Sequence, residues 1–359
     1  MKRTHVHRTP VLACTAALVS MVWFLPAAYA QSVQLYGTAD VAVGQLANQN
    51  PGAPTTGVTE IRGVHSGALQ TSYIGFRGSE SLGGGWTAKF QLESFLRYDL
   101  GTPGRFDASP TGGADGFWSR ESYVGLAGPV GEVRLGTNGN PAWVTLIQSS
   151  PLGANSVFSP AFRQLYNGGT RGRSVIDTSM PNSVRYLSPV FAGFSFNAAL
   201  QAGEGRGTGY NYAAAVRYAS GPLQLTAAVQ DAEHQPGPAN ATAAKQELKI
   251  VGAAWNFGFM RLMATYTTVQ NVGNKSKLPQ FGVTVPLGGG TVQFATQTDE
   301  NTVAASGART ERKTTTGGYV YPLSKRTDLY GFLMREEFPV VGPAAKEGDS
   351  YVVGIRHQF

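Results

Sequence analysis

The amino-acid sequence predicts an all-β protein whose antiparallel strands close into a transmembrane barrel. Two observations lead to this prediction: apolar and polar residues alternate along many short segments, and the connections between those segments alternate between short and long. Successive side chains of a strand point to opposite faces, so the alternation predicts strands with one apolar and one polar face. A mean hydropathy of −0.14 fits a wall that meets lipid outside and water inside.

Residues 1–30 have the features of a secretory signal peptide. A basic start is followed by an apolar run from Val11 to Leu25, and Ala28-Tyr29-Ala30 supplies the small residues of a cleavage site. The run is shorter than the roughly 20 residues of a membrane-spanning helix, which argues against an uncleaved anchor. We therefore expect the barrel to occupy 31–359.

Composition excludes several classes of protein. The formal net charge is +7, but the basic residues are scattered singly, so nucleic acid is not an expected partner. The only cysteine, Cys14, lies in the predicted signal peptide, so the mature chain would have neither a disulfide nor a thiolate metal site. We expect no cofactor. No apolar stretch after the signal peptide approaches the length of a membrane helix.

The alternation is clearest in Trp86 to Glu93, where even positions are apolar and odd positions are polar or charged. The opening strand repeats it, with Leu35 and Val43 on one face and Asp40 on the other, and so does the closing strand around Val353. We predict about sixteen strands, near 32–46, 66–78, 85–98, 117–127, 131–136, 180–188, 191–203, 209–219, 222–233, 247–257, 258–270, 278–286, 290–299, 312–321, 326–338 and 349–359.

The connections favour a membrane barrel over a soluble β-sandwich, because a sandwich does not require short and long loops to alternate. The longer loops are near 47–65, 99–116, 137–179, 234–246, 271–277, 300–311 and 339–348. An even number of strands places both termini on the short-turn side, and closure removes unpaired edges. Aromatic residues beside short turns fit the girdles at a lipid boundary, namely Trp86, Trp255, Phe257, Tyr319, Tyr321 and Phe359.

Four segments carry a family resemblance. They are Gly75 to Glu93, Tyr123 to Gly136, Pro181 to Pro189 and Gly354 to Phe359. In this order and spacing they resemble the trimeric general porins of Gram-negative bacteria, in particular the β-proteobacterial and neisserial-like branch.

The resemblance implies a sixteen-stranded homotrimer in the outer membrane that lets small hydrophilic solutes and ions diffuse through it. It also implies a long third loop, here 137–179, that folds inward and narrows the channel. The terminal Phe359 is similar to the signal read by the outer-membrane assembly machinery, and lipid and lipopolysaccharide are the expected surroundings.

Charges at the narrowest part of a channel set its ion preference. The proposed constriction loop contains Arg163, Arg171 and Arg173 but only one acid before the next strand, Asp177. Alternation places four further charges on the lumen side of the wall, Lys89, Glu93, Arg134 and Arg185. We therefore predict a weak to moderate anion preference. The family commonly has basic residues where this sequence has Tyr73, Thr137 and Ser179, so its arginine ladder is thinner.

Rival functions remain open. A barrel enzyme would need a set of catalytic groups, but after cleavage only His65, His234 and His357 remain, and Glu336 and Glu337 face opposite sides of a strand. An adhesion barrel without a lumen would need fewer strands than this chain offers. A substrate-specific channel could use the loop aromatics Trp143, Phe158, Phe162 and Tyr166, although packing against the wall is the favoured interpretation.

Overall fold

A computed structural model describes residues 33–49, 58–105, 116–166, 176–203, 209–233, 245–271, 273–339 and 347–359. The predicted signal peptide lies outside these residues, so its cleavage stays a prediction.

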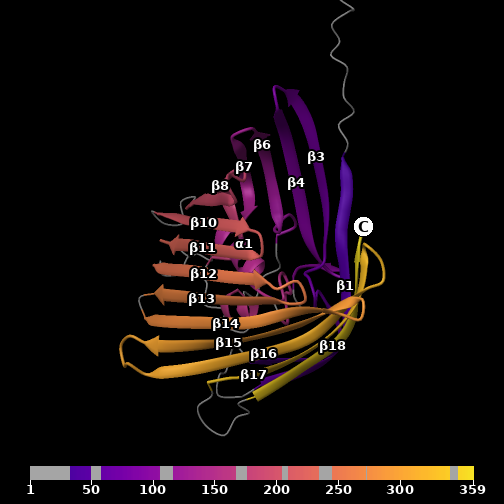
Figure 1. Cartoon of the computed structure of the whole chain (residues 1–359), viewed down its shortest axis with the longest axis vertical. Coiled ribbons are helices and arrows are strands. Elements are labelled where there is room, and N and C mark those ends of the chain that lie inside the picture. The colour runs from indigo at the N-terminus through magenta and orange to yellow at the C-terminus, as the bar shows by residue number, and fades with distance from the viewer. Residues whose placement is uncertain are drawn as a thin grey trace, which may run out of the picture.

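The described residues form one antiparallel sheet that closes on itself (Figure 1). The predicted all-β barrel is therefore confirmed. Sixteen strands make the wall: β1 (Gln34–Gln49), β3 (Tyr73–Gly83), β4 (Trp86–Arg97), β6 (Glu121–Gly128), β7 (Gly131–Gly139), β8 (Ser179–Leu187), β9 (Phe194–Ala202), β10 (Tyr210–Ser220), β11 (Leu223–Ala232), β12 (Gln246–Asn256), β13 (Arg261–Asn271), β14 (Asn274–Leu287), β15 (Gly290–Val303), β16 (Arg309–Pro322), β17 (Thr327–Glu337) and β18 (Glu347–Gln358). Two further strands add to it: β2 (Val58–Ser66) pairs with β1, and the short β5 (Thr102–Pro103) pairs with β4.

Closure joins the first strand to the last. β1 pairs with β18 on one side and with β2 and β3 on the other. At the short-turn rim the backbones of Gly37 and Phe359 exchange two hydrogen bonds of 3.2 Å, and Figure 1 shows the C-terminus beside the start of β1. A Cβ at Gly37 would approach the carbonyl oxygen of Tyr73 to 2.4 Å, so only glycine fits this seam.

The two faces of the wall differ as the alternation predicts. Outward-facing Val43 and Val353 are 63% and 71% exposed, whereas inward-facing Thr38 and Asp40 are buried. The predicted girdle residues Trp86, Trp255, Phe257, Tyr321 and Phe359 are also exposed. Neither helix among the described residues is long and apolar enough to cross a membrane.

The structure corrects the predicted strand at 66–78 and the predicted loop at 47–65. Part of that loop is β2, and the next wall strand begins only at Tyr73. The reason is the carboxylate of Asp40, which accepts hydrogen bonds from the backbone N–H groups of Leu69 (3.1 Å) and Gln70 (2.7 Å). These donors are therefore not available to a strand ladder.

Two loops predicted at 271–277 and 300–311 are shorter than expected. β14 begins at Asn274 and β15 continues to Val303, and the two strands pair as far as Asn274 and Val303. The residues that extend them are polar, for example Lys277 opposite Glu300. Such segments have no apolar face, so periodicity alone does not mark them as strands.

Candidate functional site

The segment between β7 and β8 carries two helices that no periodic pattern predicted. α1 spans Pro141–Ser149 and α2 spans Pro160–Leu165. Each begins at a polar residue followed by proline: Asn140 accepts a hydrogen bond from the backbone of Ala142, and Ser159 accepts one from Phe162. Proline is favoured at the first helical position because its missing N–H is not needed there.

Both helices pack against inward-facing wall residues, so the loop lies inside the barrel, where Figure 1 shows α1 behind β11 and β12. Phe158 stacks on Phe332 of β17, with ring centroids 5.5 Å apart. Phe162 and Leu165 are buried in a cluster with wall residues that include Ile250. The predicted inward-folded third loop is thus observed over its described part.

The loop aromatics mostly anchor the loop, as the favoured interpretation predicted. Phe158, Phe162 and Tyr166 are buried. Trp143 is only partly buried and lies edge-on to Phe162 and Tyr166, at 5.2 and 5.4 Å between centroids. Its remaining surface lies on the side of α1 that faces β4 and β6.

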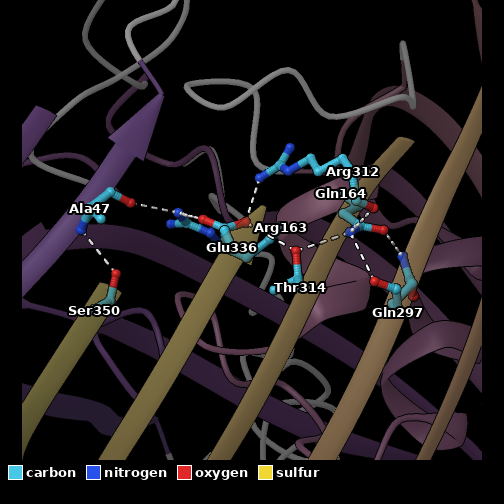
Figure 2. Close-up of polar contacts among 8 residues, drawn as sticks. All are labelled: Ala47, Arg163, Gln164, Gln297, Arg312, Thr314, Glu336 and Ser350. Atoms are coloured by element: carbon cyan, nitrogen blue, oxygen red, sulfur yellow. Dashed lines mark hydrogen bonds and ion pairs between the residues drawn. The ribbon is translucent and has the colours of Figure 1, made fainter. Parts of the chain in front are cut away.

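A buried network fixes α2 to the wall, and Figure 2 shows it. Arg163 donates to the backbone carbonyl of Ala47 at 2.9 Å and forms an ion pair with Glu336 of β17. Glu336 also accepts from Arg312 at 2.7 Å and from Thr314 at 3.1 Å. We call Arg163, Glu336 and Arg312 the loop latch.

The neighbouring residue Gln164 adds amide contacts to the latch. Its side chain donates to Thr314 Oγ1 at 3.0 Å and accepts from Gln297 Nε2 at 2.8 Å. These contacts bind α2 to β15 and β16 (Figure 2).

The burial of Arg163 corrects the expectation that it lines the passage. The residue is 1% exposed, and it forms an ion pair with Glu336. The sequence did not reveal this because Glu336 lies 173 positions along the chain. Arg163 holds the loop in place and adds little charge to the water-filled space.

Three of the predicted basic residues lie together on the wall of β4, β7 and β8. Arg134 and Arg185 occupy directly opposite positions, and like charges so placed repel. Glu132 offsets this repulsion, since it accepts from Arg134 Nε at 2.7 Å and from Lys89 Nζ at 3.1 Å. Arg185 is only 4% exposed and donates to Asn197 at 2.9 Å.

Glu93 also faces inward but is covered by its partners and is 2% exposed. It forms an ion pair with Arg120, and it accepts from the Tyr36 hydroxyl at 2.5 Å and from Gln91 at 2.9 Å. The guanidinium of Arg120 lies 3.9 Å from the centre of the Tyr73 ring. A basic group therefore lies against Tyr73 even though Tyr73 is not itself basic.

The loop and the wall leave a narrow space between them. This cavity of about 180 Å³ has Arg120 and Glu121 on the wall side and Trp143, Val144 and Ile147 of α1 on the loop side. One side of the space is charged and the other is apolar. We call it the constriction gap.

Asp177, the acid predicted at the end of the loop, pairs with Arg105 rather than with a loop arginine. Arg105 donates to it at 2.6 Å and also lines the constriction gap. Burial raises the pKa of Asp177, but the guanidinium of Arg105 outweighs this effect and holds that pKa below its ordinary value. The pair is therefore charged at neutral pH.

Other predicted residues are placed differently or lie outside the described ranges. Arg171 and Arg173 of the loop, and His234, are outside them. His65 lies in β2, not in a loop, with Nε2 3.3 Å from the carbonyl oxygen of Gly44. Within the described ranges, no group of three or more acidic or histidine side chains is arranged to hold a metal ion.

Sequence reasoning missed several charged groups of the lumen. Glu132 precedes Arg134 by two residues, so the alternation that placed Arg134 inside also places Glu132 there. Arg105 lies outside the predicted strands, where alternation gives no direction. Arg120 lies in the strand predicted at 117–127, where alternation puts it on the outer side with Val124, but β6 begins only at Glu121. Arg217 and Arg261, which lie beside the C-terminal end of α1, were also missed. For Arg217, the alanine-rich stretch before it hides the alternation.

Comparison with known proteins agrees with this geometry. The profile of a family described as Gram-negative porin matches residues 14–339. Outer membrane porin protein 32 of Delftia acidovorans is 30% identical, over 93% of this chain and 96% of the relative. Major outer membrane protein P.IA of Neisseria meningitidis serogroup C is 31% identical, over 57% of this chain and 45% of the relative.

Solved structures have the same fold. The structure described as the anion-selective porin from Comamonas acidovorans superimposes with a TM-score of 0.73 at 26% identity, covering 92% of this chain and all of the other. This chain has a closed sixteen-stranded wall and an inward loop that a buried latch holds, with charged groups lining the gap. A family profile also covers most of the chain. The chain belongs to the Gram-negative porin family and forms a channel in the outer membrane.

Proposed function

We propose that the channel passes small hydrophilic solutes and ions by passive diffusion, with a weak preference for anions. The observation that carries the proposal is the charge of the inner wall near the loop. On the side of the loop that faces β4, β6, β7 and β8, five basic groups lie against four acidic groups. The basic groups are Lys89, Arg105, Arg120, Arg134 and Arg185, and the acidic groups are Glu93, Glu121, Glu132 and Asp177. The excess is small, which is why a weak preference is proposed.

A passing ion interacts strongly with these charges, because water in a narrow passage screens charges less than bulk water does. Arg171 and Arg173 would add to the excess if they face the passage, and they remain proposed constriction residues. The relative from Comamonas acidovorans, which is described as anion-selective, supports the same direction.

The test is the reversal potential of the refolded protein in a planar bilayer under a potassium chloride gradient. We expect the reversal potential to shift toward the equilibrium potential of chloride, and to shift less in Arg134→Gln. Equal permeability of potassium and chloride in the wild-type channel would contradict the anion preference. Folded protein without any current would contradict the open channel itself.

We also propose that the protein assembles as a homotrimer surrounded by lipid and lipopolysaccharide, as its family resemblance implies. Support comes from an apolar hollow on the outer face, where Gly317 and Gly331 leave room between Val43, Leu333 and Val353. The molar mass in mild detergent, measured by light scattering, tests the trimer. A monomeric mass for folded protein would contradict it.

No enzymatic activity is part of this proposal. Porin-family proteins are channels. His65 is buried, with Nε2 3.3 Å from the carbonyl oxygen of Gly44, and His357 Nδ1 lies 2.9 Å from the hydroxyl of Thr327 on the outer face.

A further inference from the structure

A second cavity lies on the other side of the constriction loop, between the end of α1 and the wall. Its volume is about 550 Å³. Arg217 of β10, Gln224 of β11 and Arg261 of β13 line it, close to the turns that join these strands at the short-turn rim. None of these residues belongs to the constriction gap.

The two arginines converge on one neutral oxygen. Arg217 Nη2 donates to Gln224 Oε1 at 3.1 Å, and Arg261 Nη2 donates to the same oxygen at 3.0 Å. Gln224 cannot turn away, because its Nε2 donates to the backbone carbonyl of Gln148 in α1 at 2.9 Å. The loop thereby holds an acceptor at the point where both guanidinium groups meet.

Like Arg185, which donates to Asn197, this pair has no carboxylate in an ion pair with it among the described residues. Other inward-facing arginines of the described wall have one. Arg134 has Glu132, Arg120 has Glu93 and Arg312 has Glu336. For Arg217 and Arg261, no ion pair is found within the described ranges, and no acidic residue lines the cavity. Arg217 Nε is in addition buried without a hydrogen-bond partner among the described residues.

The cavity therefore holds two positive charges that nothing in the described wall neutralises. The nearby C-terminal end of α1 carries only about half a negative charge, and Gln224 already occupies one of its carbonyls. Neighbouring polar groups add contacts for a ligand: Thr284 is paired with Arg261 and with Gln293 across adjacent strands, and Gln293 Oε1 has no partner among the described residues.

We infer that Arg217 and Arg261, with Gln224, form a binding subsite for an oxyanion, either a phosphate or a carboxylate group. A guanidinium fork matches an anion that offers two oxygens, and a charged acceptor binds it more strongly than the amide oxygen of Gln224 does. An oxyanion in the cavity binds guanidinium N–H groups that Gln224 leaves available, such as Arg217 Nε. Gln224 stays beside the ligand because Gln148 holds it.

The subsite would let the channel discriminate among anions, since chloride is a single atom and does not offer the fork two separate acceptor atoms. This inference rests on the proposed open channel, because the ligand reaches the cavity through the lumen. Binding must stay weak enough for release, as transport requires.

The experiment measures chloride current through single channels while inorganic phosphate, and separately acetate, is added at constant ionic strength. We expect a saturable fall of the current for the wild-type protein. For R217Q/R261Q the half-saturating concentration should rise by about tenfold or more, equivalent to about 1.4 kcal/mol. Lys249→Gln removes one basic charge from the outer face of β12, away from the cavity, and should keep the wild-type half-saturation.

The two probes separate the sources of the ligand: saturation by phosphate alone indicates a phosphate site, and saturation by both indicates a general oxyanion site. A linear response to both, or equal saturation in R217Q/R261Q, overturns the subsite. If the double variant does not fold, R217K/R261K keeps the charge without the fork, and unchanged half-saturation in it also overturns the inference. Calorimetric titration of the folded protein with phosphate tests binding without any current, so a closed channel and an absent subsite give different results.

Discussion

Glu132 lies between two basic groups of the lumen wall, with Lys89 at 3.1 Å and Arg134 at 2.7 Å. Its charge cancels much of the field that either base would present to a passing ion. At the scale of single residues, ion preference therefore depends on the acids as much as on the arginines. Alternation indicates on which side of the wall a residue lies, but it does not indicate its partner.

Replacing this acid should strengthen the anion preference. We expect Glu132→Gln to raise the permeability of chloride relative to potassium by up to about fivefold, because a solvent-exposed charge interaction contributes about 0.2–1 kcal/mol. The reversal potential under a salt gradient measures the change. Glu247→Gln on the outer face, where Glu247 pairs with Lys249, is the matched control and should leave the potential unchanged. A shift toward potassium in Glu132→Gln would contradict the lumen placement.

The charge state of Asp177 determines how the ion preference responds to a fall in pH. Because Arg105 holds the pKa of Asp177 below its ordinary value of 3.8, the carboxylate keeps its charge as the pH falls from 7 to 5. The stabilisation from the Arg105–Asp177 ion pair is fully present at a pH above the ordinary pKa of the carboxyl group. It is lost only as the pH falls through the depressed pKa.

We therefore expect Asp177→Asn to show a stronger anion preference than wild type at pH 7 and equally at pH 5. The two proteins should converge only below pH 3.8, where wild-type Asp177 is protonated. Reversal potentials at a series of pH values measure the difference. Convergence already at pH 5 would show that Arg105 does not control this carboxylate.

At the scale of elements, the constriction loop is held by a charge cluster and by apolar packing together. The latch joins α2 to β16 and β17, and Phe158 stacks on Phe332 of β17. The sequence contains the helix starts, since Asn140-Pro141 and Ser159-Pro160 are polar cap and proline pairs. It does not contain the docking, because the latch joins residues that are far apart in the chain.

Removal of the latch carboxylate should loosen the loop. Glu336→Gln removes the carboxylate that the buried guanidinium groups of Arg163 and Arg312 share, and breaking a buried ion pair in this way costs about 3–5 kcal/mol. We expect a lower free energy of unfolding in urea, and larger fluctuations of the open-channel current.

The matched control is the next residue on the same strand. Glu337 points outward, is half exposed and lies 4.0 Å from Lys313. Glu337→Gln should change neither stability nor current noise appreciably. If both variants behave alike, the latch does not hold the loop.

At the scale of the whole molecule, most of the wall could be predicted from the sequence. Period-two alternation places the strands and their outer faces because lipid outside and water inside impose the same rule on every strand. It fails where another interaction decides the backbone, as at Leu69 and Gln70, whose N–H groups bind Asp40. It also fails for charge, because each ion pair depends on the curvature and register of the closed barrel.

Phe359 lies at the seam where the first and last strands close the barrel. Its backbone pairs with Gly37, and its exposed ring lies at the short-turn rim, where the ring would collide with any side chain added at Gly37. Phe359→Ala keeps both backbone hydrogen bonds and removes only the ring. Refolding into lipid vesicles should therefore stay efficient, whereas insertion in cells should fall severalfold if the assembly machinery reads the terminal aromatic. Equal loss in vesicles and in cells would instead make the ring a structural part of the seam, and no loss in either would exclude both roles.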